Sequence, residues 1–217
     1  VQRVPTAHVL GFVEQMGLRF AVDERVLIPR SFIGELLENS LADWIEDSES
    51  IDSVLDLCTG SGCLAILAAH AFPNAEITAS DISPDALVLA RSNVALHGFE
   101  DDIDVLEGDL FAGVGKQKFD LILSNPPYVT AESMAALPEE FRHEPTLALA
   151  AGDDGNDVLR RMLKEAKSHL NPGGLLVVDM GHNRDLVEAA FPTLPFVWLA
   201  TEASDGGVFL LRAEDLE

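Results

Sequence analysis

Residues 51–71 read IDSVLDLCTGSGCLAILAAHA, and this stretch decides the fold class. The segment Ile51–Leu55 is typical of a short buried strand, and Leu64–Ala71 consists of helix-forming residues with few β-branched side chains. Between them, Gly60 and Gly62 predict a tight turn, because glycine adopts positive φ readily. Strand, glycine turn and helix form the first crossover of a doubly wound parallel sheet, where ligands bind beyond the carboxyl ends of the strands.

The glycine turn departs from the pattern of dinucleotide-binding proteins. That pattern is G-x-G-x-x-G with a pyrophosphate on the helix N-terminus, whereas Leu64 and Ala65 stand where a third glycine is needed here. Asp56 also places a negative charge beside the turn, which suits a cationic amine better than a phosphate. A nicotinamide-dependent oxidoreductase is therefore disfavoured.

Acidic residues follow the next two predicted strands. Asp81 follows the strand Ala75–Ser80, where a carboxylate can accept both hydroxyls of a ribose. Asp109 follows the strand Ile103–Glu107 and can accept from an adenine amine, with Leu110 as an apolar face for the ring. Taken alone, each acid fits a structural cap better than a ligand contact, but acids at three successive strand ends indicate a nucleoside site.

A fourth predicted strand, Phe119–Ser124, leads into Asn125-Pro126-Pro127-Tyr128. The Asn125 side-chain oxygen and the Pro126 carbonyl are two acceptors for a planar amino group, because prolines cannot donate to a sheet ladder. Tyr128 offers a flat wall on which such a group can stack. We predict that Asn125, Pro126 and Tyr128 are catalytic and that, with Pro127, they bind the substrate. The alternative is that the tetrapeptide only ends a strand and turns the chain.

The rest of the chain completes an α/β pattern. Leu18–Val22 and Arg25–Ile28 alternate around an acidic turn and predict a β-hairpin, and helical spacing of apolar residues predicts a helix over Phe32–Trp44. Ser83, before a proline, is typical of a helix N-cap. Thr130–Gly155 is a long polar segment that we interpret as a substrate-facing loop. The later elements are a helix at Asn156–Leu170 stopped by Asn171-Pro172-Gly173-Gly174, a strand at Leu175–Met180, a helix at Arg184–Phe191, and an antiparallel closing pair at Phe196–Ala200 and Gly207–Leu211.

These motifs resemble those of class I methyltransferases that use S-adenosyl-L-methionine, and within them the protein-glutamine methyltransferases of the HemK/PrmB family. The matching segments are VLIPRS at 26–31, DLCTGSGC at 56–63, DISPDAL at 81–87, NPPY at 125–128 and RHEP at 142–145. Ser31 after Pro-Arg, together with Cys58 in the glycine turn, favours the PrmB branch, which methylates a glutamine of large-subunit ribosomal protein number three. Phe32 departs from the proline often found after that serine, so the release-factor branch stays an alternative.

The resemblance implies a Rossmann-like, mostly parallel sheet with an antiparallel closing strand, preceded by the hairpin. It implies S-adenosyl-L-methionine as cofactor and methyl transfer to a glutamine amide by direct displacement. The implied cofactor-binding residues are Asp56, Cys58, Thr59, Gly60, Ser61, Gly62, Asp81, Ile82, Asp109, Leu110 and Asn125. Arg30 and Glu35 are expected at the entrance or in a surface ion pair, and Glu144 with Pro145 is expected to shape the substrate loop or a plain turn.

Length and composition fit one soluble catalytic domain. With 217 residues and 47% hydrophobic content, the chain can bury a core without disulfides or metals. The resemblance implies that residues 1–30 are the end of an N-terminal helical domain plus the hairpin, and that 31–217 form the catalytic domain. Cys58 and Cys63 with scattered histidines make no metal-ligand set and suggest a reducing, cytoplasmic location. No apolar stretch approaches the length of a membrane span.

The formal net charge of -23 at pH 7 bears on partners. Proteins that grip naked nucleic acid usually carry a basic patch, so direct nucleic-acid binding is disfavoured. An acidic surface attracts a basic protein such as a ribosomal protein. The alternative is that the negative net charge reflects solubility or a salty habitat and not a basic partner. Two other functions stay open, namely a nucleic-acid amino methyltransferase and a non-catalytic cofactor-binding scaffold. The sequence does not indicate an oligomeric state.

Overall fold

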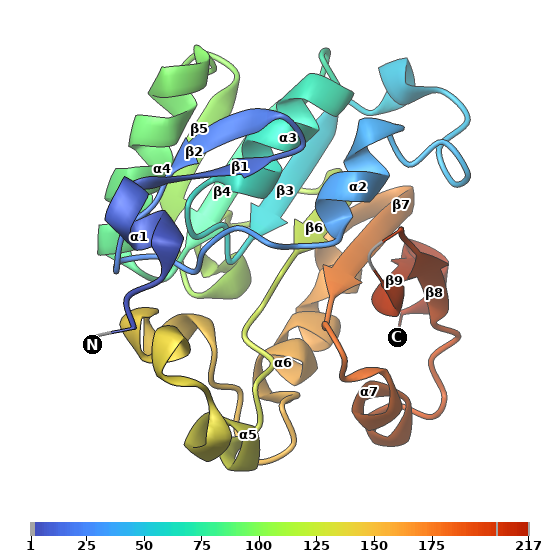
Figure 1. The fold of residues 1–217 in the computed structure, drawn as a ribbon. Coiled ribbons are helices and arrows are strands. Elements are labelled where there is room, and N and C mark those ends of the chain that lie inside the picture. The colour runs from blue at the N-terminus through green and yellow to red at the C-terminus, as the bar shows by residue number, and fades with distance from the viewer. Residues whose placement is uncertain (1–2, 203, 217) are drawn as a thin grey trace.

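The computed structural model describes residues 3–202 and 204–216, and its centre is a seven-stranded sheet (Figure 1). The strand order is β5-β4-β3-β6-β7-β9-β8. All neighbouring strands pair in parallel except that β9 runs antiparallel to both β7 and β8, which confirms the predicted sheet. The strands are β3 (Ser53–Leu57), β4 (Glu76–Asp81), β5 (Ile103–Glu107), β6 (Phe119–Ser124), β7 (Leu170–Asp179), β8 (Val197–Ala200) and β9 (Asp205–Arg212).

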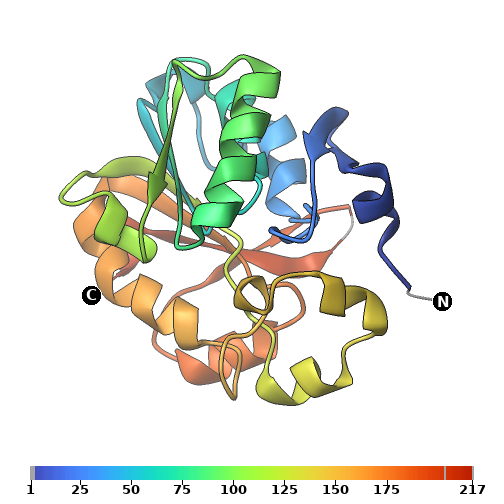
Figure 2. The same ribbon diagram turned by 90° about the vertical axis from the view of Figure 1, so that its left-hand side faces the viewer.

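Helices cover both faces of the sheet (Figure 2). One face carries α2 (Ile33–Glu38), α3 (Cys63–Ala71) and α4 (Pro84–His97), and the other carries α6 (Asp157–Ala166) and α7 (Arg184–Ala190). Side chains alternate across a strand, so Val54 packs in the first core and Leu55 in the second. The buried sheet therefore has two apolar cores, as a doubly wound fold requires.

Several predicted boundaries are close to those of the structure. The strands at Ile103–Glu107 and Phe119–Ser124 are confirmed, and the N-cap is confirmed because the Ser83 Oγ accepts from the Ala86 N–H at 3.2 Å. The first strand runs over Ser53–Leu57 rather than Ile51–Leu55. This shift places Asp56 inside the strand and not after it.

A hairpin is confirmed and its predicted strand at Leu18–Val22 is present as β2 (Leu18–Ala21), but the predicted partner strand at Arg25–Ile28 is wrong. The hairpin is formed by β1 (Phe12–Gln15) and β2, after a short helix α1 (Thr6–Leu10). Met16 and Gly17 both have positive φ, 47° and 71°, which is the geometry that a two-residue hairpin turn requires. The expected turn residue Asp23 instead binds the Arg25 side chain, and residues 25–31 continue as an irregular segment toward the sheet. The proposed domain boundary at residue 30 stays a prediction.

The helix predicted over Phe32–Trp44 is wrong beyond Glu38. Ser40 and Leu41 have positive φ, 49° and 53°, so the chain leaves the helix there. The Ser40 hydroxyl donates to the Ala71 carbonyl at 3.0 Å, which ties this turn to the end of α3. Leu41 is still buried in the core, which explains why the apolar spacing looked helical.

Residues 130–155, here called the 130–155 loop, contain more structure than the sequence predicts. The loop holds the helix α5 (Ala131–Ala136) and 3₁₀ turns at Glu139–His143 and Thr146–Ala148. Its base is closed by Val129, whose N–H donates to the Leu149 carbonyl at 2.8 Å. The loop lies below the strand ends and beside the N-terminal segment (Figure 1), where Arg3 and Glu140 form an ion pair at 2.6 Å.

The C-terminal half follows the predicted order with shifted ends. The helix predicted at Asn156–Leu170 is α6 plus a 3₁₀ turn at Lys167–His169, and the Asn-Pro-Gly-Gly stop is already part of β7. The helix at Arg184–Ala190 and the closing antiparallel pair are confirmed. Within residues 3–202 and 204–216, no helix has both the length and the apolar character needed to cross a membrane.

Candidate functional site

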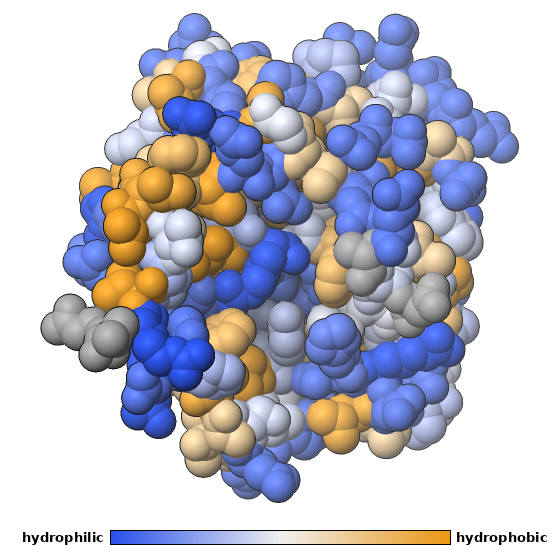
Figure 3. Space-filling view, in the orientation of Figure 1, coloured by the Kyte–Doolittle hydropathy of each residue, from blue (hydrophilic) through white to orange (hydrophobic). Residues whose placement is uncertain are grey.

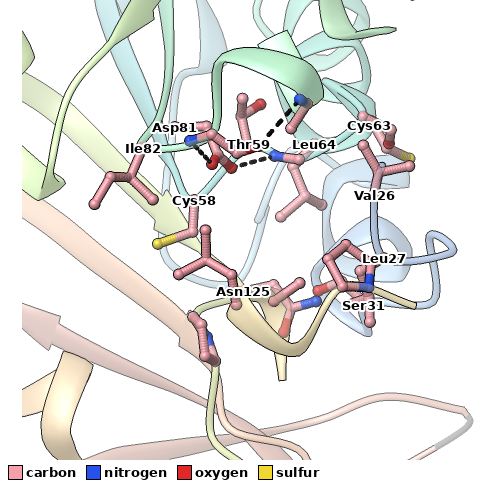
Figure 4. Close-up of a pocket in the computed structure, with 18 of the residues that line it drawn as sticks. Val26, Leu27, Ser31, Cys58, Thr59, Cys63, Leu64, Asp81, Ile82 and Asn125 are labelled. Carbon is pink, nitrogen blue, oxygen red and sulfur yellow. Dashed lines mark hydrogen bonds between the residues drawn. The ribbon is translucent and has the colours of Figure 1, made fainter. Parts of the chain in front are cut away.

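A cavity of about 200 Å³ lies at the carboxyl ends of the central strands (Figure 4). The strand order reverses between β3 and β6, which is where doubly wound sheets bind ligands. Ten predicted site residues line it, namely Cys58, Thr59, Gly60, Ser61, Asp81, Ile82, Asp109, Leu110, Asn125 and Pro127. Four others, Asp56, Gly62, Pro126 and Tyr128, are not among the lining residues.

The glycine turn is held in place by its neighbours. Gly60 and Gly62 have φ of 54° and 80°, and Cys58 adopts φ 59°, which is uncommon for a residue with a side chain. A Cβ on Gly62 would lie 3.4 Å from Ala90, so α4 packs directly against the turn. The Asn93 side chain, also from α4, donates to the Ser61 carbonyl at 2.9 Å. The turn is therefore a rigid wall of the cavity.

Asp56 lies beneath this turn and is fully buried. Its Oδ2 accepts from the Thr59 hydroxyl and, at 3.1 Å, from the Ala65 N–H in the first turn of α3. Its Oδ1 is buried and has no hydrogen-bond partner in the described part of the chain. Burial raises the pKa of Asp56 to about 7, against the opposing effect of the two hydrogen bonds. The structure shows a residue that organises the turn; its contact with a cationic amine stays a prediction.

This burial predicts a pH-dependent effect of Asp56→Asn on stability. A carboxyl whose pKa rises from 3.8 to about 7 on folding stabilises the fold fully below pH 3.8 and loses that contribution as the pH rises through 7. Relative to the Asn variant, the wild type should lose up to about 4 kcal/mol of unfolding free energy over this range, at roughly 1.4 kcal/mol per pKa unit. Urea unfolding of both proteins at several pH values between 4 and 8 measures the difference. A difference that does not change with pH would contradict the assignment.

Asp81 ends β4 on the rim of the cavity (Figure 4). Its Oδ2 accepts from the Gly60 N–H and its Oδ1 from the Ser83 N–H, both at 2.9 Å. Burial raises the pKa of this carboxyl, and the hydrogen bonds oppose the rise. Each carboxylate oxygen keeps a further lone pair, so the predicted contact with two ribose hydroxyls is compatible with this geometry.

Asp109 faces the same cavity from the loop after β5. Its Oδ2 accepts from the Nη2 of Arg161 at 2.7 Å, and Arg161 also lines the cavity, from α6. Sequence reasoning missed Arg161, because nothing in the pattern of α6 indicates which of its charged residues reaches a loop 52 residues earlier.

Asn125 lies on the opposite side of the cavity from Asp81 (Figure 4). Its Oδ1 is buried and has no hydrogen-bond partner among the residues that the structure describes. Leaving a buried acceptor unpaired costs about 1–3 kcal/mol, so an N–H donor that reaches this oxygen would be bound there. Pro127 lines the cavity beside it, whereas Pro126 does not.

Tyr128 does not line the cavity and instead fixes the end of the Asn-Pro-Pro turn. A Cβ on Gly181 would lie 2.8 Å from the Tyr128 ring, so the ring packs directly on that glycine. The Tyr128 carbonyl accepts from the Asn183 side chain at 2.6 Å. Burial raises the pKa of the Tyr128 hydroxyl. The structure shows an anchoring contact, and the stacking of an amide on Tyr128 stays a prediction.

Arg30 and Glu144 connect the two sides of the cavity mouth. Both guanidinium Nη atoms donate to the two Glu144 oxygens at 2.7 Å, and the guanidinium lies 5.0 Å from the Phe141 ring centroid. The Glu144 side chain is only 3% exposed. The pair thus fastens the 130–155 loop, which lines the cavity with Pro145 and Leu147, to the segment 25–31. The expected partner Glu35 accepts from the Glu202 N–H instead.

Asp179, at the end of β7, is a second residue that the sequence analysis missed. It is buried, and its Oδ2 accepts from the Ser31 hydroxyl and the Phe32 N–H, both at 2.8 Å. Its Oδ1 accepts from the Gly181 N–H at 2.9 Å, and burial raises its pKa. Asp179 therefore places Arg30 at the cavity. The sequence signal that could have identified Asp179 is its place at the end of a predicted strand, like that of Asp81.

Comparison with known proteins identifies the family. A family model described as a methyltransferase small domain matches residues 37–153. A ribosomal protein uL3 glutamine methyltransferase of Neisseria gonorrhoeae is 53% identical over 216 residues, covering 100% of this chain and 72% of the relative. The protein of the same name from Burkholderia pseudomallei is 52% identical, with coverage of 99% and 72%. The chain belongs to the ribosomal protein uL3 glutamine methyltransferase family. The resemblance inferred from the motifs is confirmed.

Solved structures support the fold. A methyltransferase from Pyrococcus furiosus has a TM-score of 0.64 at 18% identity, with coverage of 91% of this chain and 89% of that structure. An RNA methyltransferase from Salinibacter ruber, in complex with S-adenosyl-L-homocysteine, has a TM-score of 0.53 at 21% identity, with coverage of 86% and 94%. This chain therefore has the class I methyltransferase fold.

Proposed function

We propose that this chain transfers the methyl group of S-adenosyl-L-methionine to the side-chain amide nitrogen of a glutamine in ribosomal protein uL3. The observation that carries the proposal is the place of Asn125, which lines the cavity together with the glycine turn and the strand-end acids and whose Oδ1 has no hydrogen-bond partner among the described residues. The choice of uL3 as substrate comes from the names of two relatives that are about half identical to this chain.

The polar groups of the cavity fit this cofactor. Asp81, Asp109 and the Asn125 Oδ1 are acceptors, and S-adenosyl-L-methionine offers donors in its amine, its two ribose hydroxyls and its adenine amine. The same carboxylates would repel the pyrophosphate of a dinucleotide. When bound, the cofactor supplies an activated methyl group on a sulfonium. We assign the ribose to Asp81 and the adenine end to Asp109 and Leu110.

The protein's contribution to the reaction is placement. The Asn125 Oδ1 accepts one hydrogen of the glutamine amide, which turns the nitrogen lone pair toward the methyl group. Acceptance of the other hydrogen by the Pro126 carbonyl stays a prediction, because Pro126 is buried and does not line the cavity. Positive charge builds on that nitrogen during transfer, so the Asn125 Oδ1 binds it more tightly in the transition state than in the ground state. Holding two reactants in line can supply on the order of 7–11 kcal/mol.

The charge of the chain suits a basic protein substrate. Its net charge of -23 raises the encounter rate with a basic ribosomal protein, and most of the face in Figure 3 is hydrophilic. Hydrophobic surface gathers on the left of that view, over α1 and α4, where Val9, Leu10 and Val88 are exposed. The expected cytoplasmic location is consistent with a ribosomal substrate, and direct RNA binding is not part of the proposal.

Methyl transfer to unmethylated ribosomal protein tests the proposal. The enzyme is incubated with labelled cofactor and with uL3, free and within ribosomal extract, and the label is located by mass spectrometry. We expect the label on one glutamine of uL3. Label in RNA or in a release factor would support those alternative substrates, and calorimetric cofactor binding without any transfer would support a non-catalytic scaffold.

A further inference from the structure

The ion pair between Arg161 and Asp109 stands at the adenine end of the proposed cofactor site. The Nη2–Oδ2 distance is 2.7 Å, and both residues line the cavity. Their side chains are 51% and 46% exposed, so the pair lies on the cavity rim and not in the core. An ordinary surface ion pair of this exposure contributes about 0–1 kcal/mol to stability. Its position beside the cavity is what gives it a further role.

The two partners differ in how firmly they are held. Arg161 extends from α6, whose opposite face is buried in the second core through Leu159 and Met162. Asp109 sits in a tight loop, where Leu110 has φ 52° and a Cβ on Gly113 would lie 2.9 Å from the Glu107 carbonyl. Both backbones are therefore fixed, and the remaining freedom is the rotation of the Asp109 carboxylate.

Arg161 removes that freedom and uses only one of the two carboxylate oxygens. Within residues 3–202 and 204–216, the other oxygen, Oδ1, has no hydrogen-bond partner. A guanidinium is a rigid, permanently charged donor, and the pair also raises the pKa of Arg161. Asp109 is thus an oriented acceptor with one oxygen available to a ligand.

We propose that Arg161 is a positioning residue for base recognition, because it holds Asp109 so that the free oxygen accepts from the exocyclic amine of adenine. The assignment rests on the proposed function, since it takes S-adenosyl-L-methionine as the ligand. It predicts discrimination against a hypoxanthine ring, which carries a carbonyl where adenine carries the amine. The hypoxanthine carbonyl cannot donate to the Asp109 carboxylate, so the two oxygens repel each other and neither gains a hydrogen bond.

Isothermal titration calorimetry with S-adenosyl-L-homocysteine and S-inosyl-L-homocysteine tests this role. Arg161→Met removes the charge and keeps the apolar stem, and Arg161→Lys keeps the charge. The matched control is Arg160→Met on the same helix, because Arg160 pairs with Asp154 and Asp157 and does not line the cavity.

The wild type is expected to bind the adenine ligand at least about tenfold more tightly, consistent with one charge-assisted hydrogen bond. Arg161→Met should weaken adenine binding about fivefold and leave hypoxanthine binding nearly unchanged, with partial recovery in Arg161→Lys and no change in Arg160→Met. If Arg161→Met weakens binding of both ligands equally, or keeps the wild-type ratio of the two affinities, the role of Arg161 is overturned and the proposed function is not affected. A wild type that binds neither ligand would overturn the proposed function and the assignment with it.

Discussion

Replacing Asn125 by alanine is expected to lower kcat for methyl transfer by about 10²–10³-fold, the usual effect of removing one hydrogen-bonding group that stabilises charge in a transition state. Asn125 lines the cavity and its buried Oδ1 has no partner within the described residues, so this oxygen has unused hydrogen-bonding capacity for an amide hydrogen that reaches it. Because its interaction strengthens as charge develops on the nitrogen, kcat should fall more than KM rises. Steady-state kinetics with uL3 measures both constants.

The Asn125 experiment needs two controls. Calorimetry with S-adenosyl-L-homocysteine shows whether the variant still binds the cofactor product, which separates lost chemistry from lost cofactor binding. Asn74→Ala removes the same side chain at an exposed position that does not line the cavity, and it should leave kcat unchanged. An Asn125→Ala enzyme with a near-normal kcat would refute the proposed mechanism.

Arg30→Ala is expected to destabilise the fold strongly at neutral pH. The substitution leaves the Glu144 carboxylate, 3% exposed, without the guanidinium that donates to both of its oxygens. Breaking a buried pair from one side costs about 3–5 kcal/mol, and the 39% exposure of Arg30 places the expected loss near 3 kcal/mol. Urea unfolding measures it. The same change should raise KM for uL3, because the 130–155 loop loses its attachment.

The control for Arg30→Ala is Arg184→Ala. Arg184 pairs with Glu188 one helical turn away, and the two side chains are 48% and 46% exposed. Removing such a pair should cost at most about 0.5 kcal/mol. A double variant, Arg30→Ala with Glu144→Ala, should be less destabilised than the sum of its single variants. Equal losses for the Arg30 and Arg184 variants would show that the loop does not depend on this pair.

Local physical rules were enough to predict the frame of the site. The glycine turn needs positive φ at Gly60 and Gly62, and the apolar runs before it and after it have the length of a strand and a helix. Strands that are buried on both faces have a continuous apolar signal, so their ends were close to correct. The end of a parallel strand is also where a ligand can reach the sheet, which is why Asp81, Asp109 and Asn125 were found.

Tertiary contacts fixed the position of the hairpin turn and the end of the helix that begins near Phe32, which the local sequence did not predict correctly. Two turns were possible between residues 12 and 28, and the positive φ of Met16 and Gly17 was not visible in the pattern. The helical spacing that reached Leu41 was interrupted because Ser40 bonds the end of α3. A short window of sequence does not contain these partners, so the errors fell on segments whose conformation depends on distant residues.

The sequence alone determined the α/β crossover, the order of the strand-end acids and the Asn-Pro-Pro-Tyr segment, because each depends on the conformational preferences of neighbouring residues. Only the tertiary structure decided that Asp56 is buried under the turn, that Arg30 binds Glu144 and that Arg161 holds Asp109. The two ion pairs join residues 114 and 52 positions apart, and their partners are selected by the packing of helices and loops around the sheet. No spacing rule along the chain encodes such a choice.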